Sequence, residues 1–97
     1  MSTEPYKPWD TADVLTDDET IIAYLQAALA EDDPAFFVKA VGHVARAKGM
    51  TAIAQETQLG RASLYKALSG DRNPRLGTVM QVLGAVGVQL AVAPKAT

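Results

Sequence analysis

The chain has 97 residues, of which 48% are hydrophobic and 21% are charged, and it contains no cysteine. This composition predicts one small globular domain and argues against wholesale disorder. No apolar run approaches the roughly eighteen residues of a transmembrane helix, and the first residues lack the apolar core of a secretory signal. Without cysteines, disulfides and thiolate metal sites are excluded. We expect a cytoplasmic protein without membrane contact that is held together by packing alone.

The charges are divided unevenly along the chain. The net charge is −2, but residues 1–34 carry nine acidic residues against Lys7 alone, a local charge of −8. Residues 35–97 carry eight basic residues against Glu56 and Asp71, a local charge of +6. The C-terminal part therefore suits a phosphate backbone, and the N-terminal part suits a basic partner. The alternative is that the acidic residues only keep the N-terminus soluble.

The N-terminal residues show no regular pattern. Residues 1–15 contain Pro5 and Pro8 and have no helical period, so we expect an irregular acidic segment there and a single domain over residues 16–97. The segment also contains three apolar side chains, which need burial against the domain or against a partner. These are Trp9, Val14 and Leu15.

Caps and apolar periodicity predict the first two helices. A capping box over residues 16–19, with Thr16 as the N-cap, begins a helix that runs to about Glu31. Its apolar stripe consists of Ile21, Ile22, Leu25, Ala28 and Leu29. Asp33 and Pro34 begin a second helix that ends at Gly49. Its buried face contains Phe37, Ala40, Val41, Val44 and Ala45, and the opposite face, which we interpret as solvated, carries Lys39, His43 and Arg46.

The sequence gives no sign of catalysis. His43 is the only histidine, so no second imidazole or thiol is present to share a metal ion. A trio of Ser63, His43 and Asp71 can be drawn in any chain of this size, and no nucleophile elbow or Gly-rich phosphate loop accompanies it. We therefore predict a protein that is not an enzyme, with no catalytic residues, no metal site and no cofactor.

Residues 51–69 have the spacing of a helix-turn-helix. Thr51 is a candidate N-cap for a short helix to Thr57, and a second helix is predicted from Arg61 to Leu68 or Ser69, closed by Gly70. The small Ala54 permits close approach of the two helices, and Leu59 fills the corner at the turn. Ile53, Leu64 and Leu68 complete the contact. This spacing is typical of the motif, although an ordinary αα-corner is the alternative.

The outward face of the second helix favours a DNA contact. Arg61 can bind guanine O6 and N7 in a bidentate manner, Lys66 can reach guanine or phosphate, and Ala62 can touch a thymine methyl group. No acidic residue lies on this face, whereas a solvated helix normally carries both signs. Flanking polar residues suit phosphate contacts that set the register. The predicted DNA-binding residues are Thr51, Arg61, Ala62, Ser63, Tyr65, Lys66, Ser69, Arg72 and Arg75.

The turn of the motif departs from the usual pattern. A glycine in the left-handed conformation usually stands where this chain has Gln58, and Gly60 follows two residues later. Either Gln58 adopts a positive φ at a cost of roughly 1 kcal/mol, or the turn has shifted. The two alternatives differ in how Arg61 would enter the major groove of DNA.

The C-terminal third predicts one more helix and the only strand. The helix runs from about Leu76 to Val86, with its inward residues at Val79, Val82, Leu83 and Val86, and Gly87 ends it. Residues 88–92 then alternate like a strand, and a lone strand needs a partner. We expect antiparallel pairing of two copies through Val88, Leu90 and Val92, which gives a homodimer with recognition helices about 34 Å apart. A frayed apolar tail packed on the domain is the alternative.

Several segments together resemble a known family. They are Tyr24–Leu29, Asp33–Phe37, Val44–Met50, Arg61–Ser69 and Asn73–Pro74. The chain from about Asp10 to Pro94 resembles the HigA-like addiction-module antidotes, which are antitoxins with a Cro/C1-type helix-turn-helix. Together with the predicted elements, this resemblance gives an all-α fold: a five-helix Cro/C1-type helix-turn-helix domain with one short C-terminal strand paired across a dimer. It also places the DNA-reading helix on Arg61 to Lys66.

The resemblance implies an antitoxin that neutralises a RelE/ParE/HigB-like toxin and represses its own operon by binding operator DNA. Toxins of that type are basic, so the acidic N-terminal part becomes the candidate toxin-binding surface. Its predicted residues are Trp9, Asp13, Val14, Leu15, Asp17 and Asp18. A stand-alone Cro/C1-type repressor without a toxin, and an interaction module that has lost DNA binding, are the alternatives.

Overall fold

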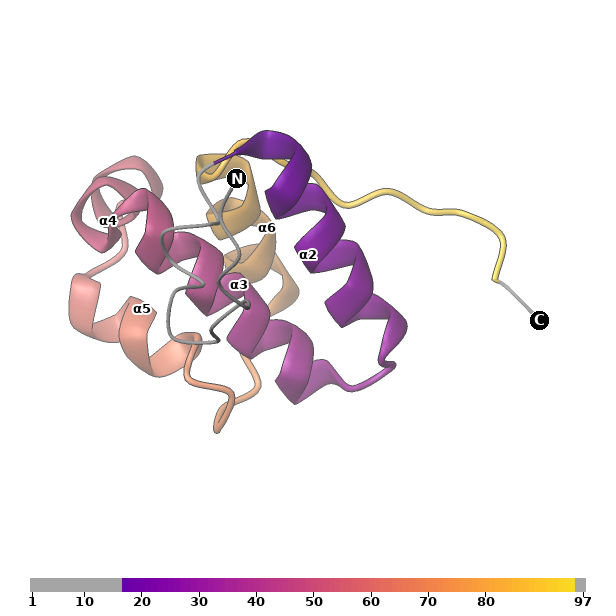
Figure 1. Cartoon of the computed structure of the whole chain (residues 1–97). Helices are drawn as coiled ribbons and strands as arrows, with labels where there is room; N and C mark the ends of the chain where they lie inside the picture. Colours follow the sequence, from indigo (N-terminus) through magenta and orange to yellow (C-terminus); the bar gives the residue numbers. More distant parts are fainter. Residues whose placement is uncertain (1–16, 96–97) are drawn as a thin grey trace, which may run out of the picture.

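The computed structural model describes residues 17–95, which form five helices and contain no strand (Figure 1). The helices are α2 (Asp18–Ala30), α3 (Pro34–Lys48), α4 (Met50–Thr57), α5 (Arg61–Ala67) and α6 (Leu76–Ala85). The all-α prediction with five helices agrees with this arrangement. The predictions for residues 1–16, including Trp9, Asp13, Val14 and Leu15, lie outside the described residues.

Aspartate side chains begin the first two helices. The Asp17 carboxylate accepts hydrogen bonds from the Thr20 backbone N–H at 3.0 Å and from the Thr20 hydroxyl at 2.9 Å. The prediction of Thr16 as the N-cap was therefore wrong by one residue. Asp17 caps α2 instead, and its carboxylate can accept both bonds at once. Asp33 caps α3 as predicted and accepts from the backbone N–H of Ala35 at 3.1 Å.

Gly49 joins α3 directly to α4. Its φ of 107° ends α3 and allows α4 to begin at Met50, and the Ile53 N–H donates to the Gly49 carbonyl at 3.1 Å. Thr51 therefore lies within the first turn of α4, where its side chain makes no capping bond. The prediction that it is the N-cap was wrong, because glycine turns the chain without an intervening capping residue.

The core forms around α3, which packs against α2, α4 and α6 (Figure 1). Most of the predicted inward residues are buried, including Ile21, Val44, Leu64 and Val82, each with an exposed fraction of 0%. The stripe predicted on α2 is divided: Ile21, Leu25 and Ala28 are buried, but Ile22 and Leu29 are exposed. The 3.6-residue period identified the apolar positions, and only the neighbouring helices decide which of them are covered.

The chain leaves the domain after α6 as an extended tail (Figure 1). The Val88 N–H donates to the Leu83 carbonyl at 3.0 Å, which ties the start of the tail to the end of α6. Beyond it, Leu90 is 38% exposed and Val92 is fully exposed. Residues 88–92 form no strand within this single chain, so their pairing across a dimer stays a prediction.

Candidate nucleic-acid interface

The buried side of the helix pair α4–α5 consists of the residues that the sequence spacing predicts. Ile53, Leu64 and Leu68 are buried, with exposed fractions of 2%, 0% and 2%. Ala54 and Leu59 are half-buried and pack against the same core. Because both leucines of the α5 segment point into the domain, the opposite face of this helix is held toward solvent.

The turn between α4 and α5 contains a left-handed Gln58. Its φ and ψ are 61° and 25°, and the neighbouring Thr57 hydroxyl donates to the Ile53 carbonyl at 2.7 Å and accepts from the Leu59 N–H at 3.3 Å. Gly60 is the N-cap of α5, and Arg61 is its first residue. Of the two sequence alternatives, the positive φ at Gln58 is the one that the structure adopts, and the turn has not shifted.

Replacing Gln58 with glycine is expected to raise the free energy of unfolding by up to about 1 kcal/mol, because glycine enters the left-handed region without a Cβ penalty. The midpoint of urea unfolding measures the change, provided that the m-value is the same in both proteins. Gln55→Gly, an exposed position inside α4, is the matched control and should lower stability by about 1 kcal/mol. Equal losses for both variants would contradict the role of the turn.

The outward face of α5 carries the predicted base-reading side chains. Arg61, Ala62, Ser63, Tyr65 and Lys66 are all exposed, and the helix contains no acidic residue. The Arg61 guanidinium lies 6.0 Å from the centroid of the Tyr65 ring. This distance is at the outer limit of a cation–π contact, and both side chains stay exposed, so the charge of Arg61 remains accessible.

The flanking residues are less uniform than predicted. Thr51, Arg72 and Arg75 are exposed. Ser69 is half-buried, and its hydroxyl donates to the Lys66 carbonyl at 2.9 Å and accepts from the Asp71 N–H at 3.2 Å. Its side chain therefore stabilises the turn after α5, a local role that the sequence reading did not include.

Lys39, which the sequence assigned to a solvated surface, is a basic residue beside the loop that follows α5. Its aliphatic stem lies against Gly70, where a Cβ would come within 2.6 Å of the Lys39 Cγ. Gly70 has a φ of 89° and follows α5, so α3 contributes a cation beside the loop that carries Arg72. Only the fold brings these residues together, because they are far apart in the sequence.

Gly42 sets the distance between α3 and α5. A Cβ at this position would lie 2.8 Å from the Leu68 carbonyl oxygen and 3.2 Å from the Leu68 Cβ. Leu68 is the C-cap of α5 and is buried. The absence of a side chain at Gly42 thus permits the close approach that fixes α5 on the domain.

His43 joins α3 to α2 and does not belong to a wholly solvated face. Its Nδ1 lies 2.6 Å from the Tyr24 hydroxyl, which donates to it when the ring proton is on Nε2. Burial lowers the pKa of His43, and the positive charges of Arg46 and Lys39 lower this pKa further. The neutral imidazole is therefore favoured in the folded state.

Lowering the pH from 7.5 to 5.5 is expected to reduce the free energy of unfolding. Because the folded-state pKa of His43 lies below the unfolded value of about 6.5, the unfolded chain binds more protons as the pH falls below that value. His43 is the only histidine, so His43→Gln should make the stability much less dependent on pH in this window. Urea unfolding at both pH values tests this, and an unchanged dependence in the variant would contradict it.

The described residues contain no cluster of acidic, histidine or cysteine side chains that suits a metal ion. None of the described helices is both long enough and apolar enough to cross a membrane.

Comparison with known proteins identifies the family. Residues 5–94 match the model of the family described as "Probable addiction module antidote protein". The chain belongs to this antidote family. An uncharacterized protein of Haemophilus influenzae is 43% identical over 90 residues, which cover 93% of each chain. No solved structure matches.

Membership of the antidote family implies a toxin partner. Of the predicted toxin-binding residues, the structure describes Asp17 and Asp18, which are exposed at the start of α2. They lie far from the basic residues of α5 in the sequence. The two candidate surfaces of this antidote are therefore built from different helices, α2 and α5.

Proposed function

We propose that this antidote neutralises a basic RelE/ParE/HigB-like toxin in the cytoplasm and represses its own operon as a homodimer. In this proposal α4 and α5 form a Cro/C1-type helix-turn-helix. The observation that carries the DNA-binding part is the exposed face of α5, which presents Arg61, Tyr65 and Lys66 while Leu64 and Leu68 are buried.

The chemistry of this face suits the major groove. An arginine at the start of a recognition helix can bind guanine in a bidentate manner, and the Ala62 methyl group can contact thymine. Thr51, Arg72 and Arg75 lie exposed on the flanking segments and would contact phosphates, which positions the helix without reading sequence. Lys39 adds a fourth candidate for a phosphate contact.

A gel-shift assay with the promoter DNA of the protein's own operon tests the proposal. Binding by several phosphate-contacting residues releases counterions, so the affinity should fall at least about tenfold between 50 and 200 mM salt. Non-specific DNA of equal length is the control and should bind more weakly at every salt concentration. Equal affinity for both DNAs would overturn operator recognition.

Replacing Val92 with aspartate is expected to convert a homodimer into a monomer. Val92 is fully exposed in the single chain, so the change should not disturb folding, but it places a charge in the paired strands that we propose. Sedimentation velocity measures the oligomeric state. Met80→Asp is the control, because Met80 is an exposed apolar residue on α6, outside the tail. An unchanged sedimentation coefficient for Val92→Asp would exclude pairing through the tail.

Toxin neutralisation has its own test. The product of the adjacent reading frame should arrest growth when expressed alone, and co-expression of this chain should restore growth. An Arg61→Ala/Lys66→Ala variant should still restore growth, because the proposed toxin surface does not include α5.

A further inference from the structure

Helix α2 presents apolar side chains to solvent in a regular stripe. Ile22 is 45% exposed and Leu29 is 53% exposed, and the exposed Gln26 lies between them. Spacings of four and three residues place all three on one face of the helix. Because large apolar residues at this spacing are costly to leave in water, the stripe is a candidate contact surface.

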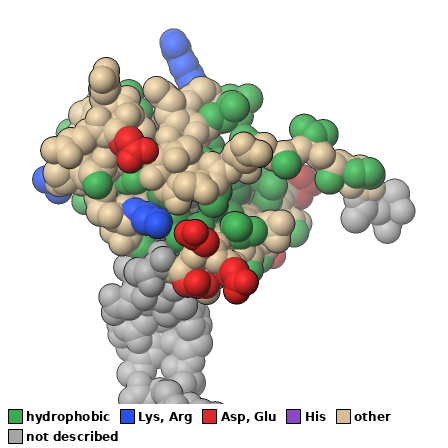
Figure 2. Space-filling view, turned by 90° about the horizontal axis from the view of Figure 1, so that it is seen from above, with side chains coloured by type: hydrophobic (Ala, Val, Ile, Leu, Met, Phe, Trp, Pro, Cys, Tyr) green, Lys and Arg blue, Asp and Glu red, His purple; other side chains and the backbone are tan. Residues whose placement is uncertain are grey.

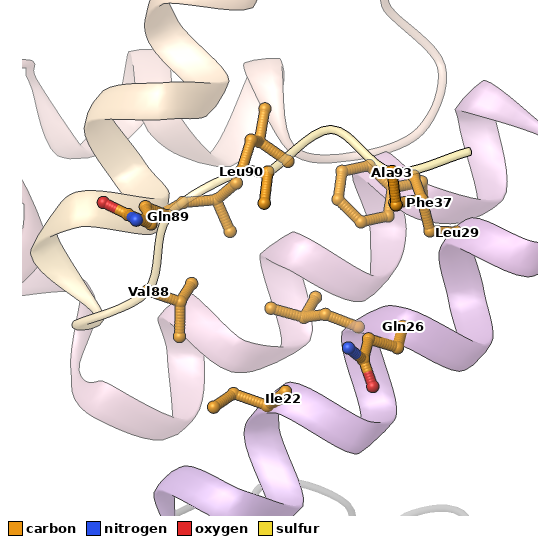
Figure 3. Close-up of a pocket in the computed structure, with 11 residues that line it drawn as sticks. Ile22, Gln26, Leu29, Phe37, Val88, Gln89, Leu90 and Ala93 are labelled. Carbon is orange, nitrogen blue, oxygen red and sulfur yellow. The ribbon is translucent and has the colours of Figure 1, made fainter. Parts of the chain in front are cut away.

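The stripe forms one wall of a groove. The other walls are Phe37 of α3 and the tail residues Val88 and Leu90, and the groove encloses about 310 Å³. Figure 3 shows Ile22 and Val88 at one end, with Leu29, Phe37 and Ala93 at the other. A second hollow, lined in part by Asp32 and Asp33, shares Leu29, Phe37 and Leu90 with the first. We call the two together the α2 groove.

Acidic residues stand at both ends of the α2 groove. Asp18 and Glu19 precede Ile22 by four and three residues and share its face, and Glu31, Asp32 and Asp33 follow Leu29. All are exposed, and residues 17–34 contain no base. The 13 residues of α2 separate the two acidic ends by about 20 Å. Figure 2 shows acidic and apolar side chains close together on one face of the molecule.

The charges argue against a second copy of this chain as the occupant. Two α2 grooves that meet across a two-fold axis would bring their acidic ends together, and like charges at an interface are unfavourable. DNA and anionic lipid surfaces are excluded for the same reason. A basic protein satisfies both the apolar stripe and its acidic ends.

We propose that the toxin inserts an apolar segment into the α2 groove, with Lys or Arg residues on either side of that segment binding the two acidic ends. This inference rests on the proposed antitoxin function and names the toxin-binding site. It extends the predicted toxin surface from Asp17 and Asp18 along α2 to Ile22, Gln26 and Leu29. Val88 and Leu90 also belong to the proposed dimer strand. Strands pair through their backbones while their side chains stand perpendicular to the sheet, so these two side chains can still face the groove in a dimer.

Site-directed crosslinking identifies the occupant. The chain contains no cysteine, so Gln26→Cys can carry a single benzophenone group in the groove without loss of a core contact. Mixed with the product of the adjacent reading frame, it should crosslink to a toxin peptide that mass spectrometry identifies. Met80→Cys on α6 is the control and should not. Crosslinks to a second copy, or to residues 1–16 of the same chain, would overturn the assignment.

Titration calorimetry with the same toxin measures the contribution of the stripe. Leu29→Arg and Gln26→Arg should each weaken toxin binding at least about tenfold, as expected for a central interface residue, while Met80→Arg should change it little. Gln26 is polar and exposed, so its variant remains informative if Leu29→Arg is destabilised. Full affinity in both groove variants would exclude this site.

Neutralising the acidic ends tests the electrostatic part. The variant Asp18→Asn/Glu19→Gln/Glu31→Gln/Asp32→Asn keeps the two caps Asp17 and Asp33 and should slow toxin association and reduce its salt dependence. Glu56→Gln/Asp71→Asn is the control. An unchanged association rate would contradict the role of these acids.

A wild-type chain that does not bind the toxin at all would instead overturn the proposed function. This outcome is distinguishable from a failure of the α2 groove, in which the wild-type chain and the groove variants bind the toxin equally well.

Discussion

Replacing Arg61 and Lys66 together with alanine is expected to weaken operator binding at least about 30-fold. Each side chain should contribute about 1–3 kcal/mol if it contacts a base edge, and about 1.4 kcal/mol corresponds to a tenfold change in affinity. Both residues are exposed on α5, so their removal should leave the free energy of unfolding nearly unchanged. A gel-shift titration with operator DNA measures the loss.

The ratio of operator affinity to non-specific DNA affinity separates the loss of base contacts from a simple loss of positive charge. Lys48→Ala/Lys95→Ala removes the same charge from exposed positions outside α5, so it should weaken operator and non-specific DNA by similar factors. The α5 variant should lose operator affinity selectively, because phosphate contacts carry no sequence information. An α5 variant that keeps the wild-type ratio of operator to non-specific affinity would exclude α5 as the reading helix.

Capping residues and apolar spacing predicted the helices, because both signals depend only on residues that are close together in the sequence. Asp33 and Pro34 begin α3 where capping chemistry places its start, and Gly49 ends it with a φ of 107°. The buried side of α4 and α5 followed from the spacing of Ile53, Leu64 and Leu68 in the same way. The cap of α2 was misplaced at Thr16, because two neighbouring residues can both cap and only the geometry selects Asp17.

The features that sequence reasoning missed depend on contacts between distant segments. Lys39 lies beside the loop that follows α5 because its stem contacts Gly70, and Gly42 matters because Leu68 packs over it. Ile22 and Leu29 have the period of core residues, yet no helix of the described part covers them. Residues 88–92, predicted as a strand, form none in the single chain, because the strand prediction depends on pairing with a second chain and that pairing stays a prediction.

Replacing Gly42 with alanine is expected to destabilise the domain relative to the same change at Gly84 by about 1–3 kcal/mol. The added Cβ would lie 2.8 Å from the backbone carbonyl of Leu68, whereas a Cβ at Gly84 meets nothing within 4 Å. Gly42 lies in the middle of α3 and Gly84 in the last turn of α6, so alanine gains helix propensity at both positions and this gain opposes the loss expected at Gly42 by at most about 1 kcal/mol. The midpoints of urea unfolding give the difference.

The same substitution connects packing to DNA binding. Gly42 lies on α3 and is buried, so it cannot contact DNA, but an added methyl group must move the Leu68 backbone and with it the end of α5. If the register of α5 on the domain positions Arg61, Gly42→Ala should reduce operator affinity in buffer where the chain is still fully folded. Gly84→Ala should not. A Gly42→Ala protein that is destabilised yet binds the operator with wild-type affinity would show that α5 can read DNA without this contact.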